Sequence, residues 1–69
     1  MQVYERRTEE VISLFLNRSI SFPECIAALD ATLAAFMPRM THDQIDHVRV
    51  VMLANNEIVV KEMERRDHD

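Results

Sequence analysis

The sequence contains no glycine and no tryptophan, and it has two prolines and one cysteine in 69 residues. Without glycine, the chain lacks the residue that phosphate-binding loops require, so this class of nucleotide site is excluded. The single cysteine, Cys25, has no partner for an internal disulfide, and no paired Cys/His framework of a small zinc domain is present. Oligomerisation is the remaining common way to stabilise so small a core.

Long apolar runs and a basic charge balance are also missing. The longest apolar stretches, such as 50–54, fall far short of the roughly 20 residues that a membrane helix needs. Residues 1–7 carry no apolar run of the kind found in signal peptides. The net charge is -4, and most of the basic residues are arginines, which favours pairing with carboxylates over binding to phosphates. We therefore expect a cytoplasmic protein that binds neither membranes nor nucleic acid.

Two capping boxes mark where helices begin. Ser21 is followed three residues later by Glu24, and Thr41 is followed in the same way by Gln44. In this motif the hydroxyl accepts from the later backbone N–H, while the later side chain accepts from the N–H of the cap residue. Pro38 disfavours helix at the residue before it. With apolar residues at helical spacing, the pattern predicts helices over about 3–17, 23–37 and 42–65, and a frayed tail over 66–69.

The turn between the first two predicted helices has to form without glycine. We expect this turn at residues 17–19, because the apolar helical spacing ends there and a capping box follows at once. Asn17 tolerates the left-handed backbone conformation that glycine would otherwise supply. We therefore expect Asn17 to end the first helix in this conformation.

The third predicted helix carries more apolar surface than two shorter helices can cover. At 1.5 Å per residue it would be about 36 Å long, against about 22 Å for each of the others. Its middle is apolar nearly all round, which in a soluble protein indicates a helix surrounded by other helices. We therefore predict an all-α fold over residues 1–69, formed by a helical hairpin and a long C-terminal helix in a single domain and completed by dimerisation.

Two patterns predict the surface through which the homodimer forms. Alanines recur every four residues in the second helix and would let another backbone approach closely. In the third helix, Asn55 interrupts an apolar stripe, where its amide could pair with its own copy and set the register. The helix propensity of alanine, or a bond of Asn55 within the chain, would explain the same residues without an interface. The predicted interface comprises Ala27, Ala31, Ala35, Val48, Met52, Asn55, Val59 and Met63.

No pattern in the sequence predicts catalysis. The three serines, at 13, 19 and 21, lie in helix or cap contexts and not in a nucleophile elbow. Cys25 has no histidine beside it by local spacing, and a free cysteine is commonly a small core residue. We therefore expect a protein that is not an enzyme and holds no cofactor.

A group of polar residues near the start of the third helix is the best metal candidate. Asp43 and His47 are four residues apart and share a helix face, whereas His42 and His47 do not. A metal site needs three or four converging ligands, so we predict no metal and keep these three residues as an alternative only.

Surplus apolar helix surface and the lack of catalytic motifs together favour a small non-enzymatic module for protein–protein interaction. Such a regulator, adaptor or inhibitor would act as a homo-oligomer and present a helical surface to a protein partner. The alternative is a helical bundle that binds a metal or a small ligand near His42, Asp43 and His47.

Overall fold

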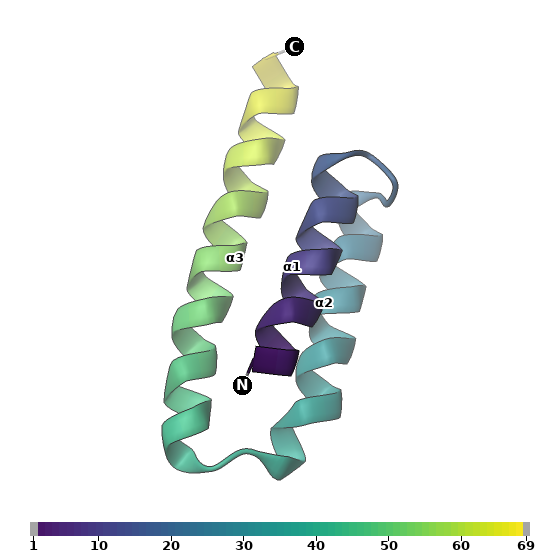
Figure 1. Ribbon diagram of the computed structural model, residues 1–69. Helices are drawn as coiled ribbons and strands as arrows, with labels where there is room; N and C mark the ends of the chain where they lie inside the picture. Colours follow the sequence, from purple (N-terminus) through teal and green to yellow (C-terminus); the bar gives the residue numbers. More distant parts are fainter. Residues whose placement is uncertain (1, 69) are drawn as a thin grey trace.

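The computed structural model describes residues 2–68, and this part of the chain is helical apart from short joints (Figure 1). The elements in chain order are α1 (Gln2–Leu16), α2 (Phe22–Phe36), the short 3-10 helix η1 (Met37–Arg39) and α3 (His42–His68). The all-α prediction with three main helices is therefore confirmed. Within the same residues, none of the helices combines the length and the apolar character that crossing a membrane requires.

Both capping boxes form as the sequence predicts. The hydroxyl of Ser21 accepts from the Glu24 N–H at 3.3 Å, and the Glu24 carboxylate accepts from the Ser21 N–H at 2.9 Å. The same reciprocal pair joins Thr41 and Gln44, at 3.3 and 2.9 Å. In each box, two side-chain oxygens accept from two backbone N–H groups that would otherwise lack a partner at the start of the helix. Such a cap stabilises the helix by about 1 kcal/mol.

The turn between α1 and α2 places a different residue in the left-handed conformation from the one predicted. Arg18 has a φ of 67°, and it is the only non-glycine residue with positive φ among residues 2–68. Asn17 instead directly follows α1 and keeps the helical hydrogen-bond pattern, because its N–H donates to the Ser13 carbonyl at 3.0 Å. The Asn17 side chain accepts from the Ser19 N–H at 2.9 Å, which holds the turn from its first residue.

The three helices lie side by side, and α1 lies between the other two (Figure 1). α1 and α2 form an antiparallel hairpin, and α3 returns along α1 in the same direction as α1. The last turns of α3 extend beyond the loop that joins α1 to α2, which gives the molecule a length of 42 Å and a width of about 18 Å. α1 therefore supplies the face on which both neighbours pack.

The core follows one side of α1. Its buried residues, Tyr4, Thr8, Ile12 and Phe15, recur at helical spacing. Ile12 and Phe15 form a cluster with one residue from each neighbouring helix, Cys25 of α2 and Val59 of α3. Partly buried side chains complete this cluster: Val11, Ile20, Leu29 and Met63.

The end of α3 contacts α1 within the segment for which the sequence predicts a frayed tail, residues 66–69. Arg66 is half-buried, and its guanidinium donates to the Phe15 carbonyl oxygen at 2.8 Å and to the Glu62 carboxylate at 2.7 Å. α3 extends to His68 and these bonds connect its end to α1, while fraying of the tail stays a prediction. Asp69 lies outside the described residues.

Candidate functional site

The outward side of α3 exposes large apolar side chains. Val50, Leu53 and Val60 are 65%, 70% and 54% exposed. Their spacing of three and seven residues places them along one side of the helix, opposite the side that packs on α1. We refer to these three residues as the outer stripe. The surface beside Leu53 is hollowed, with Arg49, Met52 and Asn56 lining the depression.

The chain itself buries a large part of the predicted dimer interface. Val48 and Val59 are each 2% exposed and Asn55 is 9% exposed, because this side of α3 faces α1. These three residues therefore pack inside a single chain, and the prediction that they form an interface is left without exposed surface in this arrangement. The physical reason is that the most apolar side of a helix is the side that the chain's own core covers first.

The other predicted interface residues have mixed environments. Met63 is half-buried and packs against the core cluster, and Met52 is half-buried beside Asn55. The three alanines of α2 lie on its exposed side, and their part in an interface stays a prediction: Ala27, Ala31 and Ala35.

The residues proposed for a metal do not assemble into a site. The His47 Nε2 atom pairs with the Glu5 carboxylate of α1, while His42 and Asp43 remain exposed at the start of α3. Within residues 2–68 there is no group of three or more His, Cys, Asp or Glu side chains that is placed to hold a metal ion. The geometry therefore gives no support to the metal-binding alternative.

Cys25 lies in the core, the common place for a free cysteine with no histidine beside it. Its side chain is fully buried in the cluster formed with Ile12, Phe15 and Val59. Burial raises the pKa of the Cys25 thiol, which keeps it in the unreactive protonated form.

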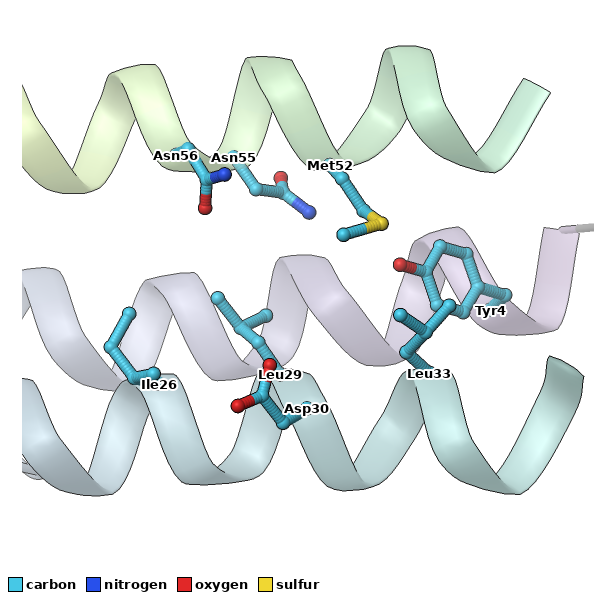
Figure 2. A pocket seen from close by; sticks show the side chains of 8 residues that line it. All are labelled: Tyr4, Ile26, Leu29, Asp30, Leu33, Met52, Asn55 and Asn56. Carbon is cyan, nitrogen blue, oxygen red and sulfur yellow. The ribbon is translucent and has the colours of Figure 1, made fainter. Parts of the chain in front are cut away.

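A cleft between α2 and α3 lies over the N-terminal half of α1 (Figure 2). It has a volume of about 120 Å³. Its walls are mainly apolar, with side chains of α2 and α3 facing one another across the space. The residues that line this α2–α3 cleft are Tyr4, Ile26, Leu29, Asp30, Leu33, Met52, Asn55 and Asn56.

Two buried polar side chains point into the cleft. Tyr4 is 2% exposed and Asn55 is 9% exposed, and Figure 2 shows both directed toward the space between α2 and α3. Among residues 2–68, neither the Tyr4 hydroxyl nor the Asn55 amide makes a hydrogen bond; because no fully buried side-chain polar atom in this part of the chain lacks a partner, both groups still reach the open space of the cleft. Burial raises the pKa of Tyr4, so its hydroxyl stays protonated and available as a donor.

Sequence reasoning identified one of these two groups and missed the other. Asn55 was noticed as a polar residue in an apolar stripe, but it was assigned to contact with a second copy. Tyr4 gives no comparable signal, because its ring fits the apolar spacing of α1. The cleft was not predicted, because it depends on how far apart α2 and α3 lie when both pack on α1.

Taken together, the fold and these surfaces define a small all-α protein of three helices, with an exposed apolar stripe on the longest helix and a cleft between α2 and α3. No protein-family description, characterised protein or solved structure matches the chain. A function has to be inferred from these two surfaces alone.

Proposed function

We propose that this protein is a non-enzymatic interaction module that acts as a homodimer through the outer stripe of α3. The observation that carries the proposal is the exposure of Val50, Leu53 and Val60, which are more than half accessible on one side of a helix. Burying such a side chain is worth about 1–2 kcal/mol, so six of them from two copies are a substantial driving force. Exposed apolar surface of this kind marks an interface more often than a pocket.

The charges along α3 favour an antiparallel arrangement of the two copies. In a parallel pair each residue would face its own copy, and Glu57 and Glu64, which lie along the stripe, would meet like charges. An antiparallel pair that sets Leu53 opposite Val60 of the second copy also sets Arg49 opposite Glu64 of the second copy. The Arg49 side chain is 74% exposed, and within residues 2–68 its one ion pair is a long 3.8 Å contact with Asp46, so it is available for this pairing.

The shape of α3 supports the same register. The depression beside Leu53 is open to the outside and is lined in part by Met52. In the antiparallel pair, Val60 of the second copy lies over this depression and fills it. The two contacts are equivalent by symmetry, so each copy contributes one filled depression.

A dimer of this kind acts by presenting helical surface to a protein partner, as a regulator, adaptor or inhibitor does. The exposed side of α2 is left free by the α3 pairing, and it carries Ala27, Ala31 and Ala35. These small residues stay our predicted contact for a further helix.

The oligomeric state tests the proposal directly. We expect sedimentation equilibrium at micromolar concentration to give about twice the 8.1 kDa mass of one chain. Leu53→Glu places a charge in the stripe and should give a monomer with unchanged helix content by circular dichroism. Leu14→Glu is the matched control, because Leu14 is a 43% exposed leucine on α1 outside the proposed interface. A wild-type protein that stays at the mass of one chain would overturn the proposal.

Exchanging the charges of Arg49 and Glu64 tests the antiparallel register of the two α3 helices separately. Arg49→Glu should weaken the dimer, because it sets carboxylates opposite one another, and Glu64→Arg added to it should restore the association. If the double variant is no tighter than the single one, the two residues do not face each other and the antiparallel register is wrong.

A further inference from the structure

The α2–α3 cleft exists because α1 holds its two neighbours apart. Both α2 and α3 pack on α1, and side chains of α2 and α3 approach each other over Tyr4 without closing the space (Figure 2). Its volume of about 120 Å³ is close to that of engineered cavities of about 150 Å³ that take one aromatic ring. A ligand of this size is a single ring or a short branched chain.

The polar groups in the cleft select a ligand that can form hydrogen bonds, which a purely apolar cavity would not do. The Tyr4 hydroxyl offers a donor, and the Asn55 amide offers both a donor and an acceptor. Both side chains are more than nine-tenths buried and lack a hydrogen-bond partner within residues 2–68. Both groups are open to the cleft, since no fully buried side-chain polar atom within residues 2–68 lacks a partner. A ligand that covers them without pairing costs free energy, so a molecule that pairs with them binds more tightly than one of the same shape that does not.

The charge at the rim restricts the ligand further. Asp30 is exposed at the edge of the cleft, and none of the eight lining residues is basic. A carboxylate or phosphate group would be desolvated next to Asp30 with no cation to pair with it. An anionic head group is therefore disfavoured, and because the two groups that meet the head group, Tyr4 and Asn55, are themselves neutral, an uncharged head group fits the site best.

We propose that the α2–α3 cleft is a binding site for a small uncharged molecule with an apolar body of about one ring and a single hydroxyl or amide group. The apolar body lies between Leu29, Leu33 and Met52, and the head group accepts from the Tyr4 hydroxyl and bonds the Asn55 amide. None of the three outer-stripe residues lines the cleft, although Met52 and Asn56 border both the cleft and the depression beside Leu53.

Titration of the isotope-labelled full chain with phenol, followed by amide NMR shifts, tests this site. Toluene has nearly the same shape without the hydroxyl, and benzoate carries an anion. We expect saturable shifts with phenol at residues of α2 and α3 around the cleft, binding of toluene weaker by about five-fold, and no binding of benzoate. Absence of saturable shifts with phenol, or equal affinity for phenol and toluene, would overturn the proposal.

The variant Tyr4→Phe separates recognition of the head group from the shape of the cleft. It should weaken phenol binding by about five-fold and leave the affinity for toluene unchanged. If Tyr4→Phe does not fold, the comparison of phenol with toluene on the wild-type chain still decides. If phenol binds only when the chain is diluted to a monomer, a second copy covers the cleft and the small-molecule proposal is wrong.

Discussion

The guanidinium of Arg66 lies 4.4 Å from the centre of the Phe15 ring, and it donates a hydrogen bond of 2.8 Å to the Phe15 carbonyl oxygen. The carbonyl lies in the last turn of α1, where helical partners run out and negative partial charge accumulates. The Arg66 guanidinium therefore binds the C-terminal end of α1, stacks on a core aromatic ring and links the last turns of α3 to α1.

Arg66→Lys should lower the free energy of unfolding by about 1–3 kcal/mol, although it keeps the charge. Lysine cannot stack its head group on Phe15 while donating to the Phe15 carbonyl and to Glu62. Urea denaturation measures the loss. Arg65→Lys is the control, because Arg65 is more exposed and bonds the same carboxylate from the outside. Equal losses for the two variants would contradict the role assigned to Arg66.

The carboxylate of Glu62 should make folding sensitive to acid. Hydrogen bonds from Arg65 and then from Arg66 lower the pKa of Glu62 from 4.5 to about 2. Because the folded-state pKa is the lower one, the stabilisation is present above pH 4.5 and is lost as the pH falls toward 2. Glu62→Gln removes this dependence. Unfolding curves at a series of pH values should show the two proteins converging in stability over this interval, and parallel curves would rule the linkage out.

Arg18→Gly should stabilise the protein. A non-glycine residue with a φ of 67° carries a steric cost that glycine lacks, and the greater freedom of unfolded glycine offsets part of the gain. The expected net gain is about 0.5–1 kcal/mol, seen as a higher melting temperature. Asn17→Gly is the matched control and should destabilise, because Asn17 is not left-handed and its side chain bonds the Ser19 N–H.

Asn55→Leu should stabilise a single chain. Asn55 is 9% exposed on the core face of α3, so an apolar side chain of similar size buries more apolar surface there, a gain of about 1 kcal/mol. Thermal unfolding at several protein concentrations measures the change and separates it from any effect on association. A loss of stability that grows with protein concentration would instead indicate that Asn55 contributes to an interface between copies.

The helices and their starts could be read from the sequence because the signals are local. Ser21 with Glu24, and Thr41 with Gln44, interact over three residues, and apolar periodicity is a property of one helix. The position of the α1–α2 turn was predictable in the same way. The sequence did not predict which residue of the turn is left-handed. That depends on where the helical hydrogen bonds stop: Asn17 still donates to the Ser13 carbonyl, and Arg18 is the residue that turns left-handed.

The sites depended on contacts between residues far apart in the chain. Asn55 attracted notice in the sequence, yet its surroundings were decided by α1, which turned Val48, Asn55 and Val59 inward and left the outer stripe exposed. The same packing brought Glu5 to His47 and Phe15 to Arg66.

By itself, then, the sequence determined how many helices form and where they begin, since capping and periodicity act within a few residues. Only the tertiary structure decided which side of α3 faces outward and that a cleft opens beside Asn55. The reason is that α1 packs on both of its neighbours and holds them apart.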